Sequence, residues 1–362
     1  MLGQRKVTRE LLVGGIGIGG SYPIAIQSMN STDTRNVEAT LAQIAALAEA
    51  GCEITRVAVP DREAALALAD ITKRSVLPVV ADIHFDYRLA LLAIESGAAK
   101  IRINPGNLGG EDRIRQVAEA AKTRKIPIRV GVNGGSISQA LIDRYGGVNR
   151  LSMVESAVQA VSALEKCDFH DIVVSVKSSD VPLSLEVYRL LSERVSYPLH
   201  IGITESGTVA EGAVRSAVGI GALLAQGIGD TLRVSLTGDP VEEVRVALQI
   251  LRALELREQG VRIVSCPTCG RTQVPLIALA EQVEKATAQL PYNMRVAVMG
   301  CVVNGPGEAR ESDVGIAGGK DQFVLFRKGE KVRTVPADRV LEELLAEIHE
   351  IGRGVKNVNL AH

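Results

Sequence analysis

Between residues 24 and 253 the chain alternates two patterns of apolar residues. Short runs rich in Val and Ile on both faces each precede a stretch with apolar residues at helical spacing, as in NVEATLAQIAALAEAG. Strands that are apolar on both faces are typical of a parallel sheet covered on both sides. The runs occupy residues 23–29, 53–59, 77–83, 99–105, 127–133, 171–177, 198–204 and 231–236. Eight such units predict an α/β fold with a TIM (β/α)8 barrel; a doubly wound open sheet, the competing fold, rarely reaches eight successive units.

The pattern changes after residue 253. Residues 254–262 are polar with one glycine and are typical of a linker, and residues 263–362 mix short strand runs with two amphipathic helical stretches, at 274–290 and 337–352. This mixture predicts a small α+β domain. The sequence therefore divides into a barrel domain (1–253), a linker (254–262) and a second domain (263–362).

The composition excludes several classes of function. The 362 residues carry a net charge of −1, which gives no electrostatic case for binding nucleic acid or a membrane surface. Aromatic residues make up 3% and tryptophan is absent, so stacking platforms for bases or sugars are not expected. The first residues lack a signal-like apolar core and no run is long enough to cross a bilayer, so we expect a cytoplasmic protein.

A glycine-rich segment near the start matches G-x-G-x-x-G at residues 15–20. A dinucleotide-binding fingerprint must follow a strand and open a helix, whereas here a strand follows. The segment predicts a hairpin that precedes the barrel.

Polar residues gather at the carboxyl ends of the predicted barrel strands, where the active sites of such barrels lie. Five of them are cationic, and few acids accompany them. Guanidinium groups suit phosphate oxygens, so this pattern predicts a site for a phosphorylated substrate, most simply a diphosphate. The alternative is a layer of structural ion pairs. The cations are Arg56, Arg102, Arg129, Lys177 and Arg233, and the other candidate binding residues are His84, Asn104, Asn133, Thr204 and Ser235.

Three acidic or imidazole side chains at the same strand ends are candidates for other roles. Glu205 follows the seventh strand, and Asp82 with His84 ends the third. His200 lies within a strand, and a packed structural role is as consistent with its position as a functional one.

The five cysteines fall into two groups. Cys52 and Cys167 end apolar helical stretches and are typical of buried small hydrophobes. Cys266, Cys269 and Cys301 follow predicted strands in the last quarter of the chain. Three thiolates with Glu308 or a histidine suit zinc, and they also suit an iron–sulfur cube; the C-x-x-C pair alone would also fit a redox pair.

Three segments together make the chain recognisable: PIAIQSMNSTDT (23–34), CPTCGRTQ (266–273) and MGCVVNGPGEARESDVGIAGG (299–319). The chain resembles the 4-hydroxy-3-methylbut-2-enyl diphosphate synthase (IspG/GcpE) family along its whole length, in the compact bacterial form. The resemblance implies an oxidoreductase that converts 2-C-methyl-D-erythritol 2,4-cyclodiphosphate to 4-hydroxy-3-methylbut-2-enyl diphosphate. This step of the methylerythritol phosphate pathway of isoprenoid biosynthesis takes up two electrons and releases water.

The resemblance also implies a cofactor and partners. A [4Fe–4S] cluster would be held by Cys266, Cys269, Cys301 and Glu308, with flavodoxin or ferredoxin as the electron donor. The cluster domain of one subunit would cap the barrel of the other in a homodimer. Glu205 is the candidate proton donor and Glu308 the replaceable ligand of the cluster. The alternatives that the residues leave open are a zinc-dependent barrel hydrolase or lyase and an iron–sulfur sensor.

Overall fold

The structure of the chain is a computed structural model. It describes residues 3–257, 260–272, 274–288, 290–301, 307, 310–319 and 321–359. The chain divides into two compact units, residues 1–256 and 257–362, and each is described by itself. None of the helices within these ranges is both long and apolar enough to cross a membrane.

The first unit contains eight parallel strands in the order β8-β7-β6-β5-β4-β3-β10-β9. A parallel bridge between Val174 and Leu199 joins the two ends of this order, which confirms the predicted barrel. The strands are β3 (Ala25–Met29), β4 (Ile54–Ala58), β5 (Val79–Asp82), β6 (Lys100–Ile103), β7 (Ile128–Asn133), β8 (Ile172–Lys177), β9 (His200–Ile201) and β10 (Thr231–Leu232). The last is shorter than its apolar run, because the backbone N–H of Leu236 donates to a helix carboxylate, Glu243, outside the ladder.

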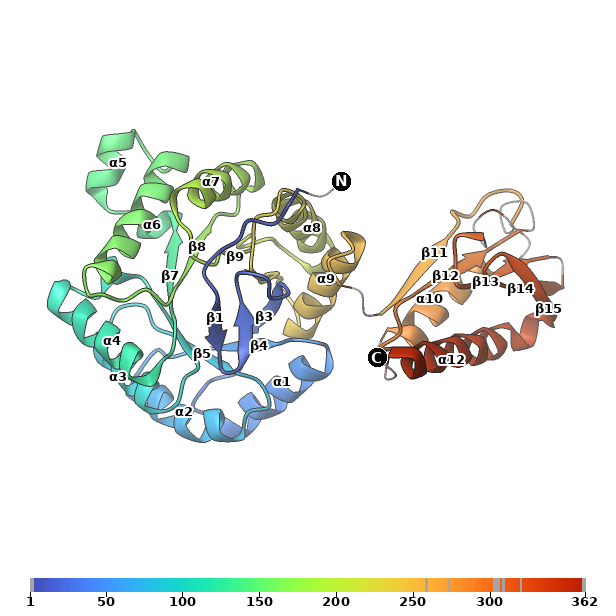
Figure 1. The fold of residues 1–362 in the computed structure, drawn as a ribbon, viewed down its shortest axis with the longest axis horizontal. Coiled ribbons are helices and arrows are strands. Elements are labelled where there is room, and N and C mark those ends of the chain that lie inside the picture. The colour runs from blue at the N-terminus through green and yellow to red at the C-terminus, as the bar shows by residue number, and fades with distance from the viewer. Residues whose placement is uncertain are drawn as a thin grey trace. The chain divides into compact units, whose positions relative to one another are not determined.

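Helices surround these strands in a ring (Figure 1). They are α1 (Val37–Glu49), α2 (Arg62–Arg74), α3 (Tyr87–Glu95), α4 (Glu111–Arg124), α5 (Gln139–Tyr145), α6 (Arg150–Glu165), α7 (Val181–Arg194), α8 (Val209–Ala225) and α9 (Pro240–Ala253), with 3-10 turns η1 (Pro105–Asn107) and η2 (Gly134–Ser136). Local sequence sets several starts. Asp61, Asp180 and Asp239 each accept a backbone N–H of the first turn, which satisfies a donor that the helix itself cannot.

A hairpin closes the amino-terminal end of the barrel. Strands β1 (Leu11–Val13) and β2 (Ile16–Ile18) pair in antiparallel fashion around Gly14 and Gly15, whose φ values of 55° and 93° suit glycine. Leu11, Val13 and Ile18 pack against the inward residues at the strand starts. The predicted hairpin is therefore present, and it provides an apolar floor for the barrel interior.

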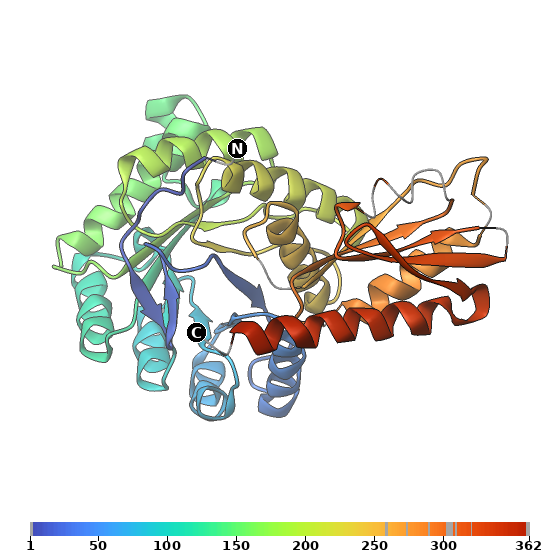
Figure 2. The same cartoon turned by 45° about the vertical axis from the view of Figure 1, so that its right-hand side comes forward.

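The described residues of the second unit form a five-stranded sheet with two long helices. Its strands are β11 (Val261–Ser265), β12 (Met294–Met299), β13 (Val314–Gly318), β14 (Gln322–Arg327) and β15 (Glu330–Pro336), in that order across the sheet. The first three run parallel and the last two antiparallel. Helices α10 (Leu276–Thr287) and α12 (Val340–Asn359), the latter after the 3-10 turn η3 (Ala337–Arg339), pack on the sheet through a shared apolar core (Figure 2). The predicted α+β architecture is confirmed.

Candidate active site

The interior of the barrel is rich in cations. Asp82, Arg102 and Arg129 are neighbours in register across β5, β6 and β7, so their side chains emerge on the same, inner face. Within the described residues, six cationic side chains lie inside the barrel, and two carboxylates form ion pairs with three of them. The cations are Arg56, Lys100, Arg102, Arg129, Lys177 and Arg233, and the carboxylates are Asp82 and Glu243.

The carboxylate of Asp82 contacts two arginines and a histidine. It lies 3.1 Å from Nη1 of Arg102, 3.9 Å from Nε of Arg56 and 3.5 Å from Nε2 of His84. Burial opposes its ionisation, but the charges of Arg56 and Arg102 and the hydrogen bond from His84 outweigh it and hold the pKa of Asp82 far below its usual range. Asp82 therefore orients two arginines and the imidazole while remaining charged.

Glu243 holds Arg233 from outside the barrel. It accepts hydrogen bonds from Arg233 at 2.8 and 3.1 Å, from the Ser28 hydroxyl at 3.0 Å and from the backbone N–H of Leu236 at 3.1 Å. These four bonds satisfy a carboxylate that is only 3% exposed. The result is a fixed guanidinium at the carboxyl end of β10.

Met29 lies between two of the arginines. Its sulfur accepts hydrogen bonds from Nη2 and Nε of Arg56 at 2.7 and 3.1 Å, and Nη1 of Arg233 lies 3.9 Å away. A thioether is a weak, uncharged acceptor, so it orients the guanidinium of Arg56 without neutralising it. Burial lowers the pKa of Arg56 to about 10, against the opposing charge of Asp82.

Arg129 and Lys177 lack acidic partners in the described part of the chain. Arg129 is 1% exposed, and its Nε and Nη1 have no hydrogen-bond partner. Burial, reinforced by the charges of neighbouring arginines, lowers the pKa of both side chains well below their usual values. Buried donors without acceptors are costly, so this arrangement favours a ligand that brings negative oxygens.

Two glycines leave room for these side chains. A Cβ on Gly131 would lie 2.3 Å from Nε of Arg102, and one on Gly202 would lie 2.4 Å from the backbone oxygen of Arg233 and 3.1 Å from Nζ of Lys177. Any larger residue would displace the guanidinium or the strand. Glycine at these positions is thus part of the construction of the site.

The remaining predicted binding residues lie at or just beyond the ends of the strands. His84 contacts Arg102, with Nε2 lying 3.1 Å from Nη1. Asn104 is buried and accepts the backbone N–H of Gly106, Asn133 is exposed, and Thr204 and Ser235 are half-buried. The structure brings His84 together with the cations, whereas the contacts described for Asn104 are local.

Glu205, the candidate proton donor, follows β9 in an exposed loop. Its φ of 52° lies in the left-handed region, which is uncommon for a residue other than glycine. Strained backbone of this kind is concentrated at functional sites.

The candidate cluster ligands are only partly within the described residues. Strands β11 and β12 pair in parallel, so Cys266 and Cys301 both follow the carboxyl edge of the same sheet. The backbone N–H of Gly300 donates to Sγ of Cys266 at 3.4 Å. Arg271 hydrogen-bonds to Cys269 through its backbone and its side chain, and these bonds lower the pKa of that thiol. Glu308 lies outside the described residues.

Family models match nearly the whole chain. The description "GcpE TIM-barrel domain" covers residues 8–248, and "GcpE protein C-terminal domain" covers residues 262–350. The chain belongs to the GcpE family. This confirms the family that the three sequence segments indicate.

Curated members of the GcpE family are similar to this chain over almost their full length. The protein of Maridesulfovibrio salexigens is 59% identical over 95% of this chain and 97% of its own, and that of Ruminiclostridium cellulolyticum is 56% identical over 96% and 99%. The protein of Geobacter sulfurreducens is 56% identical over 96% and 99%. All three are named 4-hydroxy-3-methylbut-2-en-1-yl diphosphate synthase (flavodoxin).

Solved structures resemble this GcpE chain in fold alone. Dihydropteroate synthase from Stenotrophomonas maltophilia covers 68% of the chain and 98% of its own length with a TM-score of 0.50 at 17% identity. The Yersinia pestis enzyme covers 68% and 100% with a TM-score of 0.51 at 11% identity.

Three parts of this GcpE site escape prediction from the sequence. Lys100 shares the inner face with Arg102, two residues along β6, and this parity is the signal that could have revealed it. Met29 ends its strand without a charge, so no pattern singles it out. Glu243 comes from α9, and an acid in the first turn of a helix is too common to signal a partner for Arg233.

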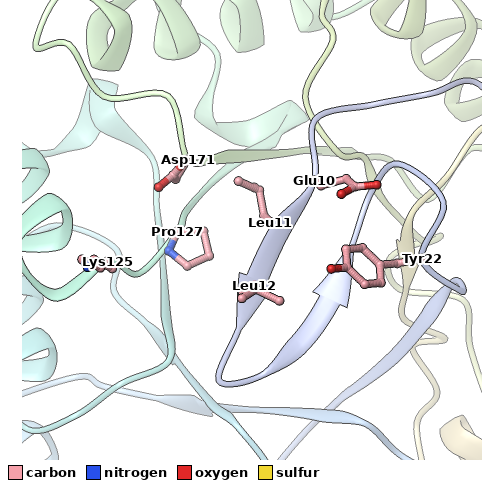
Figure 3. Close-up of a pocket in the computed structure, with 7 residues that line it drawn as sticks. All are labelled: Glu10, Leu11, Leu12, Tyr22, Lys125, Pro127 and Asp171. Carbon is pink, nitrogen blue, oxygen red and sulfur yellow. The ribbon is translucent and has the colours of Figure 1, made fainter.

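Two pockets lie outside the cationic interior. One of about 320 Å3 lies beside the hairpin at the amino-terminal end of the barrel, between Leu12, Tyr22 and the starts of β7 and β8 (Figure 3). The other, about 390 Å3, is lined by Phe85, Arg88 and Arg113 and follows directly on His84. Only the second adjoins the candidate site, at its rim.

Proposed function

We propose that the chain is a 4-hydroxy-3-methylbut-2-en-1-yl diphosphate synthase. It converts 2-C-methyl-D-erythritol 2,4-cyclodiphosphate to (E)-4-hydroxy-3-methylbut-2-enyl diphosphate by two-electron reductive ring opening and loss of water. The observation that carries the proposal is the pair of buried cations, Arg129 and Lys177, without acidic partners in the described residues, in a chain whose relatives bear this name. Ion pairs would explain Arg56, Arg102 and Arg233 but not these two.

The barrel domain is the substrate-binding part in this proposal. Arg129 contributes two buried donors without a partner among the described residues, and Lys177 adds a buried cation for which no ion pair is found there. Arg56, Arg102 and Arg233 are held in place by Met29, Asp82 and Glu243. A diphosphate offers acceptors to several guanidinium forks at once. Asn104, Asn133, Thr204, Ser235 and His84 complete the set of binding residues that we propose.

The second domain suits an iron–sulfur cluster. Two of the thiols follow one sheet edge, a backbone N–H donates to Cys266, and Arg271 hydrogen-bonds to Cys269. No three His, Cys, Asp or Glu side chains among the described residues are grouped so as to hold one metal ion. Thiolates are the usual ligands of iron–sulfur clusters, so the donor set present suits a [4Fe–4S] cluster held by Cys266, Cys269 and Cys301, with Glu308 as the proposed fourth ligand.

When bound, such a cluster supplies electrons one at a time. The chain's own residues bind the diphosphate, keep it oriented and manage protons. Glu205 is the proposed proton donor, since its carboxyl extends from a loop that directly follows β9 at the mouth. On the third strand, β5, the carboxylate of Asp82 holds the side chains of His84 and Arg102 in a fixed orientation.

The proposal includes partners. The relatives' names contain flavodoxin, which supports flavodoxin as the one-electron donor, with ferredoxin as an alternative. We also propose a homodimer, in which the cluster domain of one subunit caps the barrel of the other, and a cytoplasmic location.

The test is an anaerobic purification followed by iron and sulfide analysis and an assay with the cyclic diphosphate and reduced flavodoxin. We expect about four irons and four sulfides per chain and formation of the ring-opened product. Colourless protein with one zinc would instead support a hydrolase or lyase. Binding without turnover in the presence of reductant would support a sensor. Glu308→Ala should retain cluster iron with altered spectra and lose most turnover, and normal turnover would remove Glu308 from the ligand set.

A further inference from the structure

Lys100 crosses the interior of the barrel beneath the cationic site. It lies on β6, is fully buried, and its Nζ donates to Oε1 of Gln27 at 3.4 Å. Gln27 belongs to β3, three strands away in the sheet order, so the lysine side chain spans the barrel. Below this level lies the apolar floor made by the hairpin and the strand starts.

The surroundings of Lys100 are poor in negative charge. Its described contacts include no ion pair, and the charges of Arg129 and Arg56 act on it directly. The titratable and charged groups that face the interior from the other elements are Arg56 (β4), Asp82 (β5), Arg102 (β6), Arg129 (β7), Lys177 (β8), Tyr188 (α7), His200 (β9), Arg233 (after β10) and Glu243 (α9).

Surroundings of this kind disfavour the protonated form of the amine. Burial, followed by the charges of Arg129 and Arg56, lowers the pKa of Lys100 well below its usual value. Asp82 is engaged by Arg102, Arg56 and His84, and Glu243 by Arg233, so neither carboxylate is at hand to compensate Lys100. A ligand with two or more negative charges would reverse this balance, because it brings the missing counter-charge into a region of low dielectric.

We propose that Lys100 takes up a proton from solvent when the diphosphate binds, so that the charge beneath the cationic site follows the charge of the ligand. The neutral amine and one proton give an ammonium, and no other bond changes. The inference rests on the proposed function, since it takes the cyclic diphosphate as the ligand. Lys100 is a positioning residue, which acts on the substrate through its charge and through Arg129.

The coupling has a definite sign. Ligand binding raises the pKa of Lys100, so affinity is highest at low pH, where the amine is already charged. Affinity falls by about tenfold for each pH unit between the pKa of the free and the bound protein, and levels off above the latter. The ligand does not add a competing titration, because the phosphates of a cyclic diphosphate lack the second ionisation near pH 6 of a phosphate monoester.

Two other buried groups could take up the proton instead. Lys177 belongs to the proposed contact set, and His200 donates to or accepts from Thr231 through Nδ1 at 2.8 Å while its Nε2 has no partner. Burial, together with the charges of Arg129 and neighbouring cations, lowers the pKa of both. Replacing Lys100 and His200 in turn distinguishes these two, and uptake at Lys177 would survive in the Lys100 variants.

The test is calorimetric binding of the cyclic diphosphate to the anaerobically purified enzyme without reductant, in buffers of different ionisation enthalpy, at pH values from about 6 to 9. The slope of the observed heat against buffer enthalpy gives the protons taken up. We expect uptake by the wild type, and Lys100→Met or Lys100→Gln should lower it by about one proton while binding persists. His200→Gln and the surface change Lys122→Met should leave this proton in place.

Each contrary result has its own meaning. Binding by the wild type without proton uptake overturns the inference and leaves the proposed function intact. This outcome is measured on the wild type alone, so it does not depend on whether a variant folds. Uptake that survives in both Lys100 variants, or that disappears in His200→Gln, overturns it as well. Absence of any binding by the wild type overturns the proposed function itself.

Discussion

Arg233 and Glu243 form a bidentate ion pair that joins the barrel interior to a helix outside it. The two hydrogen bonds measure 2.8 and 3.1 Å, and the carboxylate comes from the first turn of α9. Helix α9 thereby fixes a guanidinium at the mouth without placing an acid among the other cations. Arg129 and Lys177 show the contrasting arrangement, since both are buried without an acidic partner among the described residues, and two donors of Arg129 have no partner there.

Glu243→Gln tests the positioning of Arg233. The glutamine side chain would keep the shape of the glutamate but replace one acceptor oxygen with an NH2 group that faces Arg233 or Ser28. We expect KM for the cyclic diphosphate to rise by about tenfold and the free energy of unfolding to fall by about 2 kcal/mol. Steady-state kinetics and urea unfolding measure both. Glu242→Gln, next to it in an exposed pair with Arg245, is the matched control and should change neither.

Replacing Arg129 by methionine separates function from stability. A buried guanidinium without acidic partners in the described residues costs free energy, so removing it should raise the melting temperature by a few degrees. Affinity for the cyclic diphosphate should fall by about a hundredfold. Arg124→Met, exposed at the end of α4, should do neither. A destabilised variant with unchanged affinity would show that Arg129 is a structural residue.

Gly131→Ala tests the space that Arg102 needs. The added Cβ would lie 2.3 Å from Nε of Arg102, so the guanidinium must leave Asp82. We expect kcat/KM to fall by about tenfold or more with the barrel still folded. Gly135→Ala meets no atom within 4 Å and is the control. Equal activity of the two variants would contradict this role of Arg102.

Asp82→Asn tests the electrostatic centre of the site through pH. Because the pKa of Asp82 is lowered in the folded protein, its contribution to stability is present above the unfolded value of about 3.9 and is lost as pH falls below it. The wild type should be more stable than the variant at pH 7, and the difference should shrink by about 1.4 kcal/mol per pH unit below about pH 4. Urea unfolding at several pH values measures it, and a difference that stays constant down to about pH 2 would contradict the assignment.

The alternation of apolar runs is enough to predict the barrel because strands covered on both faces leave a continuous signal. All eight strands fall inside the predicted runs, but β9 and β10 are only two residues long. For β10 the difference arises because Arg233 and Leu236 bond to Glu243, a contact 7 to 10 positions away that no local pattern encodes.

The candidate site is predictable where a charged residue also falls on the inward-facing set of alternate strand positions, as for Arg102 and Arg129 on neighbouring strands. Lys100 lies two residues before Arg102, on the same face of the strand, so this alternation also predicts Lys100 as a residue of the site. It is easily overlooked because a lysine inside a strand so often points to solvent. The role of Met29 as an acceptor for Arg56 could not be predicted, because it depends on the exact distance between two strands.

The central claim is that the barrel cations hold the diphosphate, and a crystal structure of the anaerobic enzyme with the cyclic diphosphate tests it most directly. The account predicts phosphate oxygens within hydrogen-bond distance of the Arg129 guanidinium and of Nζ of Lys177. A diphosphate bound elsewhere, with Arg129 and Lys177 contacting only protein or water, would contradict it.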